Sequence, residues 1–408
     1  MNTQKLFAER IGGASFGTSN EIYKFEKIKR AKAAAKAKQP DVELLDFGVG
    51  EPDMMAPEPI RRALKTEVDN PANRGYADNG IPEFKEAAAR YMSDFFGVTD
   101  LEPATEINHS IGSKPVLAIL PLCFIDPGDI SLVTVPGYPV LATHTRYLGG
   151  VVVQAPLLKE NGFYPDLDSI DPEVAGRAKL FYVNYPNNPT GAAPTEEFFD
   201  ALIEFADRHN ILIVQDAAYA TLVYDREPLS ILSRPGGKDT SIELHSMSKS
   251  YNMTGWRLGF TAGSPKVIQA YAEVKDNVDS GQFKAIQLAA CAGIAERALA
   301  DNIKAHYEKR LRSMVIALQK IGFEAAMPGG TFYLYVPAPK RAGSMDFASA
   351  EEASQFLIKE HMISTVPEDA AGSFLRFSAT FESAGESDDG RVVEELTRRL
   401  MSANLKWE

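Results

Sequence analysis

The chain has 408 residues, of which 45% are hydrophobic and 24% are charged, so it is long enough and apolar enough to bury a large core. Its net charge of -12 disfavours nucleic acid and anionic membranes as partners. Two cysteines cannot build a disulfide framework, and six scattered histidines form no metal-binding spacing, so we expect no metal. No signal peptide or membrane span is recognisable, which predicts a cytoplasmic protein.

The first predicted element is a helix over residues 22–38. Its second half, KIKRAKAAAKAK at residues 27–38, is rich in alanine and lysine. This composition is typical of a solvated helix face. An address signal or an anion-binding patch is the alternative interpretation.

Strand-like and helix-like segments alternate through the middle of the chain. The strand-like segments are apolar runs bounded by turn residues, at 129–135, 179–184, 211–215, 241–245 and 258–262. Residues 195–209 form an amphipathic helix pattern, with Thr195 as its cap and acidic residues in its first turn. The alternation predicts an α/β protein with a mostly parallel sheet and helices on both faces.

The pattern changes after residue 282. We expect one long helix over residues 283–321, and then an α+β unit. Its elements are a strand at 331–336, a helix at 349–360 and a strand at 374–378. The predicted domains are a large one at 46–290 and a small one formed by 1–45 and 291–408.

Lys249 lies between two serines, which alone is typical of a surface lysine. Asp216 directly follows the predicted strand 211–215, and a carboxylate at the end of a buried strand is costly unless it is paired. A protonated pyridine ring would pair it, and Tyr219 three residues later could donate to the phenolic oxygen of such a ring. The alternative for Asp216 is a cap of the next turn.

Other polar residues also follow predicted strands or precede a helix. Asn188 lies in the turn NNPTG, and Tyr138 lies in the turn PGYP. Ser113 and Lys114 precede an apolar helix in which Pro115 suits the first position, so their amides could hold a phosphate. Loops that follow the strands of an open sheet share one crevice, so these groups could surround one cofactor. A plain turn, a helix cap and ordinary packing are the alternatives.

Arg376 lies inside the apolar strand pattern FLRFS. A guanidinium on such a strand needs a planar anion, and the α-carboxylate of an amino acid fits its two parallel donors. A buried structural ion pair is the competing interpretation.

Taken together, these motifs resemble the fold-type I, class I and II aminotransferases, in family order across most of the chain. The matching pieces are residues 48–52 (GVGEP), Tyr76, 112–114 (GSK), 136–139 (PGYP), 185–191 (YPNNPTG), Asp216 with Tyr219, 246–249 (SMSK) with Arg257, and Arg376. The resemblance implies a large domain, whose mixed, mostly parallel sheet is sandwiched by helices, and a smaller α+β domain. It also implies the cofactor pyridoxal 5′-phosphate and a homodimer with shared active sites.

The resemblance implies roles for individual residues. Lys249 would be the Schiff-base lysine and the proton shuttle of a ping-pong reaction, Asp216 would hold the pyridinium, and Asn188 and Tyr219 would bind the phenolic oxygen. Tyr138 would stack on the ring. The phosphate contacts would be Ser113, Lys114, Ser246, Ser248 and Arg257, with Tyr76 of the second subunit. The implied substrate contacts are Tyr23, Gly50, Lys114, Asn188 and Arg376.

Four further segments resemble the branch of this family that acts on LL-diaminopimelate. They are residues 22–27 (IYKFEK), 73–80 (NRGYADNG), 108–114 (NHSIGSK) and 275–283 (KDNVDSGQF). The resemblance implies a reversible reaction of lysine biosynthesis. LL-diaminopimelate gives an amino group to 2-oxoglutarate, and the products are tetrahydrodipicolinate and glutamate. Candidates for the distal end of this substrate are Tyr23, Asp78, Asn79, Lys114 and Gln282, some of them reaching the site from the partner subunit; a solvated loop residue is the alternative for each. The alternatives are an aminotransferase for aspartate, alanine or aromatic amino acids, and a pyridoxal phosphate lyase.

Overall fold

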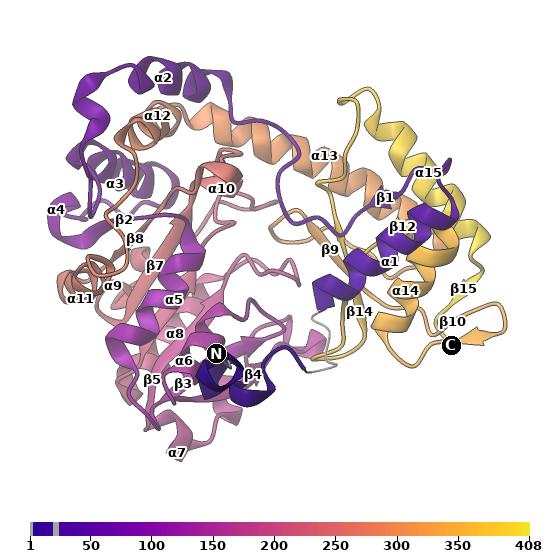
Figure 1. Ribbon diagram of the computed structural model, residues 1–408, viewed down its shortest axis with the longest axis horizontal. Helices are drawn as coiled ribbons and strands as arrows, with labels where there is room; N and C mark the ends of the chain where they lie inside the picture. Colours follow the sequence, from indigo (N-terminus) through magenta and orange to yellow (C-terminus); the bar gives the residue numbers. More distant parts are fainter. Residues whose placement is uncertain (1–2, 19–23) are drawn as a thin grey trace.

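The computed structural model describes residues 3–18 and 24–408. Its largest element is a seven-stranded sheet in the order β2-β8-β7-β6-β5-β3-β4 (Figure 1). β8 runs in the opposite direction to the other six strands, so the sheet is mixed and mostly parallel, as predicted. The strands are β2 (Ile107–Ser110), β3 (Ile130–Val135), β4 (Val151–Pro156), β5 (Ala178–Asn184), β6 (Leu212–Asp216), β7 (Ser241–Ser246) and β8 (Gly259–Gly263).

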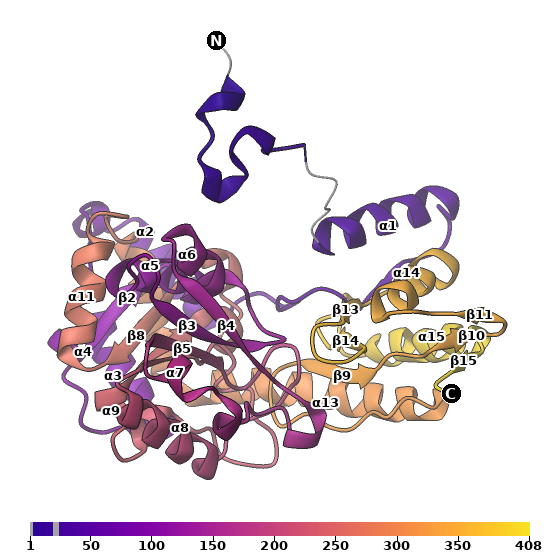
Figure 2. The same ribbon diagram turned by 90° about the horizontal axis from the view of Figure 1, so that it is seen from below.

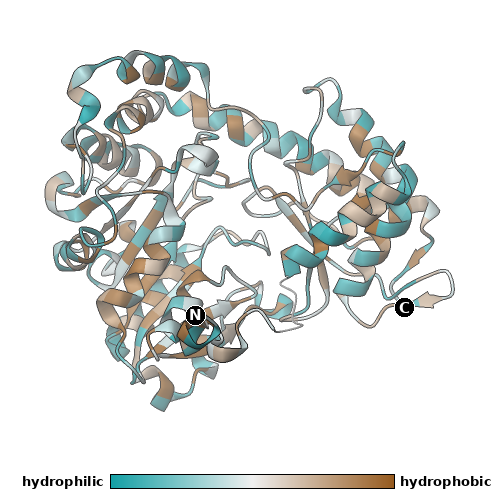
Figure 3. Ribbon diagram, in the orientation of Figure 1, coloured by the Kyte–Doolittle hydropathy of each residue, from teal (hydrophilic) through white to brown (hydrophobic). Residues whose placement is uncertain are grey.

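Helices cover both faces of this sheet, because its central strands are apolar on both sides. Two adjacent residues of β5 show this, because the hydrophobic core is divided into one cluster on each face of the sheet. Phe181 packs into the first cluster and Leu180 into the second. The apolar strands lie between helices whose outer faces are hydrophilic (Figure 3). The helices in contact with the first cluster are α2 (Glu58–Val68), α3 (Pro82–Phe96), α8 (Glu196–His209) and α12 (Lys284–Ile294). Those in contact with the second are α5 (Ser113–Phe124), α6 (Val140–Tyr147) and α11 (Pro265–Lys275). The short helices are α4 (Pro103–Glu106), α7 (Pro172–Ala175), α9 (Gly237–Thr240) and α10 (Met247–Ser250).

The prediction of one helix over 283–321 is wrong, because the chain forms two helices there. They are α12 and α13 (Arg297–Ile321), and the backbone leaves the helical conformation at Glu296, with φ -120° and ψ 85°. The break lets α12 pack against α2 and α3, while α13 turns away from the sheet (Figure 1). Ala300 in the first turn of α13 joins the core of the large sheet, and Ile303 joins a separate core.

This separate core belongs to a second, smaller unit with an antiparallel sheet in the order β13-β14-β9. Helix α1 (Lys24–Lys38) packs on this unit through Ile28, Ala31 and Ala35. Lys29, Lys36 and Lys38 are exposed, as predicted for a solvated helix face, whereas Lys27 and Lys32 are half-buried and pair with Glu351 and Asp46. The strands are β9 (Tyr333–Pro337), β13 (Val366–Glu368) and β14 (Phe374–Ser378). The remaining elements are α14 (Ala350–His361), α15 (Asp389–Ser402), the pair β1 (Leu45–Asp46) with β12 (Ile363–Ser364), and the small sheet of β10 (Arg341–Ala342), β11 (Met345–Asp346) and β15 (Leu405–Lys406).

Residues 3–18 form three short 3-10 turns that lie apart from both units (Figure 2); the turns are η1 (Thr3–Leu6), η2 (Glu9–Ile11) and η3 (Gly13–Ser15). The domain boundaries at 46 and 290 stay a prediction. Among the described helices, none is both long enough and apolar enough to cross a lipid bilayer.

Candidate active site

A cavity of about 480 Å³ lies where the carboxyl ends of β5, β6 and β7 face the smaller unit. Asn184, Asp216 and Ser246 are the last residues of these three strands, and all line the cavity. Arg376 and Tyr333 line it from the smaller unit. This is the crevice in which open α/β sheets bind ligands.

Twelve of the residues predicted for the site line this one cavity. They are Gly50, Ser113, Lys114, Tyr138, Asn188, Asp216, Tyr219, Ser246, Ser248, Lys249, Arg257 and Arg376. Tyr76 is 83% exposed and does not line it, and Tyr23 falls outside the described residues. The structure therefore brings most of the predicted residues together in one cavity.

Three candidates for the distal end of a substrate do not line the cavity and bind the protein itself. Asn79 donates through Nδ2 to Asp276 Oδ1 at 2.7 Å. Gln282 donates through Nε2 to the carbonyl oxygen of Arg257 at 2.6 Å. Asp78 accepts through its own carbonyl from Lys275 Nζ. In their own chain these residues hold two neighbouring loops, Asp78 through its backbone and the other two through side-chain amides, and a role at the site of a partner subunit stays a prediction.

Lys249 lies on α10, the single helical turn that directly follows β7. Its Nζ donates to the carbonyl oxygen of Gly50 at 2.9 Å. Burial lowers the pKa of Lys249 to about 8, with the nearby cations Arg257 and Arg376 acting in the same direction against Glu51. A lysine with this pKa has a substantial neutral fraction near neutral pH, so its amine can act as a base or a nucleophile.

Asp216 lines the same cavity and is buried, with 5% of its surface exposed. Its Oδ1 accepts from the Ala218 amide at 3.1 Å, and its Oδ2 faces the Tyr182 hydroxyl at 3.5 Å. Burial raises the pKa of Asp216 to about 6. In the described part of the chain, no cationic side chain forms an ion pair with this carboxylate. A cationic ring nitrogen in the cavity would supply the missing partner.

The smaller unit contributes a guanidinium that no carboxylate of the described residues neutralises. Arg376 Nη1 donates to Asn188 Oδ1 at 2.9 Å, and Nη2 donates to the Gly48 carbonyl at 3.1 Å. Its Cζ lies 4.1 Å from the centroid of the Tyr333 ring, and its Nε is buried without a hydrogen-bond partner. The predicted alternative, a structural ion pair, is therefore not formed here. The side chain is held in place while its charge remains available to an anion in the cavity.

The amino terminus of α5 and Arg257 form a cationic corner of the cavity. Arg257 Nη1 donates to the Thr254 carbonyl at 2.8 Å and lies 3.5 Å from Ser248 Oγ. Gly112 caps α5 with φ 89°, and a Cβ there would lie 2.4 Å from Arg257 Nη2. Pro115 occupies the third helical position rather than the predicted first, because α5 begins at Ser113. Free amides at a helix start beside a guanidinium are suited to binding a phosphate.

Two cavity residues that sequence reasoning missed organise the others. Asn184 accepts through Oδ1 from the backbone amide of Asn188 at 2.9 Å and donates through Nδ2 to the backbone carbonyl of Asp216 at 2.7 Å. It ends an apolar strand, as Asp216 does, and that signal could have found it. Tyr333 places its hydroxyl 3.1 Å from that of Tyr219. Its strand, TFYLYV, offers several aromatic residues, and the sequence does not indicate which one faces the cavity. The other missed residues are Phe25, Gly48, Ala218 and Thr254.

Among the described residues, the cavity combines three groups: a lysine with a lowered pKa, a buried carboxylate without a cationic partner and an arginine without an anionic partner. Together they indicate an enzyme that acts on small anionic substrates. The chain belongs to the family described as aminotransferase class I and II, which matches residues 42–385. It is 52% identical to the LL-diaminopimelate aminotransferase of Methanocaldococcus jannaschii, over 99% of both chains.

Solved structures share the fold. The substrate-bound BacF structure from Bacillus subtilis has a TM-score of 0.88 at 30% identity and covers 98% of both chains. A double mutant of Thermus thermophilus aspartate aminotransferase has a TM-score of 0.83 at 26% identity, over 96% of this chain and 99% of that one. The fold-type I architecture expected from the motifs is confirmed.

Proposed function

We propose that the protein transfers an amino group between LL-diaminopimelate and 2-oxoglutarate, with tetrahydrodipicolinate and glutamate as the products. The observation that carries transamination is the meeting of Lys249, Asp216 and Arg376 in one cavity. The choice of LL-diaminopimelate is supported by the relative from M. jannaschii, which is 52% identical from end to end.

Pyridoxal 5′-phosphate fits this cavity, because Asp216 lacks the cationic partner that its burial demands. When bound, the cofactor supplies a cationic ring that stores the negative charge left when a substrate loses its α-proton. Asp216 would hold the ring nitrogen, Asn188 and Tyr219 the phenolic oxygen, and Tyr138 the face of the ring. The phosphate would be held by Ser113, Lys114, Ser246, Ser248 and Arg257.

The chain's own groups then perform defined tasks. Lys249 would hold the cofactor covalently at rest. Its freed, neutral amine would take the proton from the substrate's α-carbon and deliver it to the cofactor. Arg376 and the backbone at Gly50 hold the α-carboxylate, which fixes the α-carbon beside Lys249. Donor and acceptor use this one site in turn, so the kinetics are ping-pong.

The exposed position of Tyr76 supports a homodimer. Its side chain is 83% exposed and does not line the cavity of its own chain. Nearby, Val278 and Phe283 are also exposed, at 56% and 42%, and such apolar side chains are suited to burial against another protein. In this dimer, Tyr76 of each chain reaches the phosphate in the other chain's site.

The proposed phosphate corner is tested by Gly112→Ala. The added methyl group would meet the Arg257 guanidinium and disfavour the φ of 89° at the start of α5. We expect affinity for pyridoxal phosphate to fall by roughly 10-fold, measured by absorbance titration of cofactor-free protein. Gly128→Ala is the matched control, because Gly128 has φ 90° but nothing within 4 Å of the added carbon. Equal affinities of the two variants would contradict this assignment.

A substrate screen on the purified protein tests the proposed function. LL-diaminopimelate is compared with aspartate, alanine and aromatic amino acids as donors to 2-oxoglutarate, with glutamate as the measured product. We expect LL-diaminopimelate to have the highest kcat/KM. A higher value for another donor would replace the proposed substrate, and an elimination product in place of glutamate would reject transamination.

A further inference from the structure

Residues 48–53, which we call the wall segment, contribute to two cavities. Gly48 and Gly50 line the active-site cavity, whereas Val49, Glu51, Pro52 and Asp53 line a second cavity of about 750 Å³. The wall segment therefore presents to the active site the same backbone that is proposed to meet the substrate carboxylate.

Side chains of the smaller unit hold the wall segment from the region of β14. Arg376 on β14 donates to the Gly48 carbonyl at 3.1 Å. Thr380, two residues after β14, donates to the Val49 carbonyl at 3.0 Å. The two proposed partners of the substrate carboxylate, the wall segment and Arg376, are thus already joined to each other.

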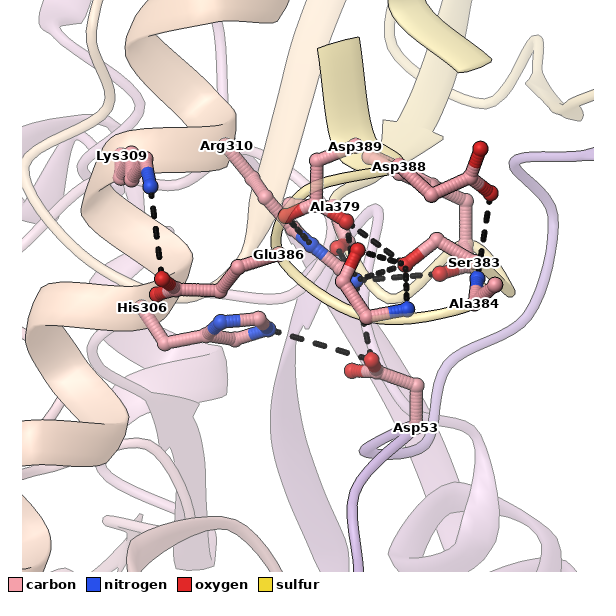
Figure 4. Close-up of polar contacts among 12 residues, drawn as sticks. Asp53, His306, Lys309, Arg310, Ala379, Ser383, Ala384, Glu386, Asp388 and Asp389 are labelled. Atoms are coloured by element: carbon pink, nitrogen blue, oxygen red, sulfur yellow. Dashed lines mark hydrogen bonds and ion pairs between the residues drawn. The ribbon is translucent and has the colours of Figure 1, made fainter. Parts of the chain in front are cut away.

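The far end of the wall segment is Asp53, which three side chains of α13 contact; Figure 4 shows two of them, His306 and Arg310. Arg310 Nη1 lies 3.0 Å from Asp53 Oδ2, the Tyr307 hydroxyl donates to Oδ1 at 3.1 Å, and His306 Nε2 lies 3.8 Å from Oδ2. Burial acts to raise the pKa of Asp53, but His306 and Arg310 outweigh it and hold that pKa below its ordinary value. The carboxylate therefore stays charged and bound.

The same guanidinium also holds the chain that follows β14 (Figure 4). Arg310 Nη1 donates to the carbonyls of Ala379 at 2.9 Å and Phe381 at 3.0 Å. Its Nε and Nη2 donate to the carboxylate of Asp389 on α15 at 2.9 and 2.8 Å. With 2% of its side chain exposed, Arg310 is a buried junction of the wall segment, the end of the Arg376 strand and α15.

We propose that Arg310, through Asp53, is a positioning residue for substrate binding. It fixes the wall segment to the chain after β14, so the Gly50 backbone and the Arg376 guanidinium keep one spacing that matches an α-carboxylate. This inference rests on the proposed aminotransferase function and extends it to residues that do not touch the cavity. Because every amino acid and keto acid substrate carries this carboxylate, both half-reactions depend on the same spacing.

Asp53→Asn tests the proposal with little change of shape. An amide keeps the shape of the side chain but removes the negative charge that pairs with Arg310, so the ion pair that holds the end of the wall segment is lost. We expect the KM values of donor and acceptor to rise together by roughly 10-fold, with kcat changed by less than about 3-fold. Steady-state kinetics on whichever substrates the unmodified enzyme uses provide the measurement.

Asp389→Asn is the matched control, because Asp389 binds the same guanidinium from α15 and not from the wall segment. Both variants lose one ion pair of Arg310, and thermal unfolding should show a lower Tm for both. Only Asp53→Asn should raise KM. Equal KM changes in the two variants, or an unchanged KM in Asp53→Asn, would overturn the positioning role.

If Asp53→Asn does not fold, Tyr307→Phe is the second variant to measure. It removes only the hydroxyl that donates to Asp53. We expect a smaller rise of KM in the same direction, and an unchanged KM would reject the role. Absence of aminotransferase activity in the unmodified protein would instead reject the proposed function. The two failures are therefore distinguishable.

Discussion

Lys249→Ala is expected to lower the transamination rate by at least about 10⁴-fold, because it removes the only amine that is placed to move the α-proton. Of the described lysines on the cavity, Lys114 is exposed and lies at the proposed phosphate corner, whereas Lys249 is held against Gly50. Single-turnover mixing of the cofactor-loaded variant with donor measures the loss directly.

Lys249→Arg separates charge from proton transfer. Arginine keeps a cation that can donate to the Gly50 carbonyl. Lys249, with its pKa of about 8, is partly neutral near neutral pH, whereas arginine stays charged. We expect this variant to be as inactive as Lys249→Ala while it retains the unfolding temperature of the unmodified protein. An active Lys249→Arg variant would contradict the role of a neutral amine.

Asp216→Asn is expected to have opposite effects on activity and on the stability of the cofactor-free protein. Without the carboxylate the ring nitrogen loses its charge partner, and we expect kcat to fall by roughly 10³-fold. Without cofactor, however, the same carboxylate is a buried charge with no cation. Its pKa rises from 3.8 to about 6, which corresponds to about 3 kcal/mol of destabilisation at neutral pH.

The sign of this stability effect fixes its pH dependence. A carboxyl whose folded pKa is raised contributes stability below its unfolded pKa, near 4, and loses it as pH rises through about 6. The asparagine variant should therefore unfold at a higher temperature than the unmodified protein at pH 7.5, with a smaller difference at pH 4.5. Thermal unfolding of cofactor-free protein at both pH values gives the comparison.

Glu243→Gln is the matched control for this prediction. Glu243 is also a buried acid on the large sheet, but His245, Ser230 and the Ile231 amide all bond its carboxylate. Its replacement should lower the unfolding temperature, because partners are left unsatisfied. Destabilisation by both substitutions would contradict the unpaired state of Asp216.

The residues of the site were predictable where strand ends and turns determined them. Asp216, Asn188 and Ser246 lie at the ends of strands or just after them, and the parallel order of the strands brings these ends to one edge. Arg376 was recognisable because a cation inside an apolar strand needs an anion. Local pattern and sheet topology made Asp216, Asn188 and Arg376 candidates beside simpler alternatives, whereas Ser246 was expected from the family resemblance.

The features that sequence reasoning missed depend on packing between distant segments. The break at Glu296 follows from the different cores that α12 and α13 join, and the helical pattern itself continues across it. Tyr333 was missed because its strand offers several aromatic residues, and the composition of the strand does not indicate which one faces the cavity. The bonds that Asn79 and Gln282 form within their own chain were not predictable, because their partners are far away in the sequence.

Peptide mapping shows whether Lys249 bears the cofactor. The purified protein is loaded with pyridoxal phosphate, treated with borohydride to fix the covalent link, digested and analysed by mass spectrometry. We expect a pyridoxyl-phosphate mass increment on the peptide that contains Lys249, at Lys249 itself. An increment at another lysine such as Lys114, or a protein that acquires none, would contradict it.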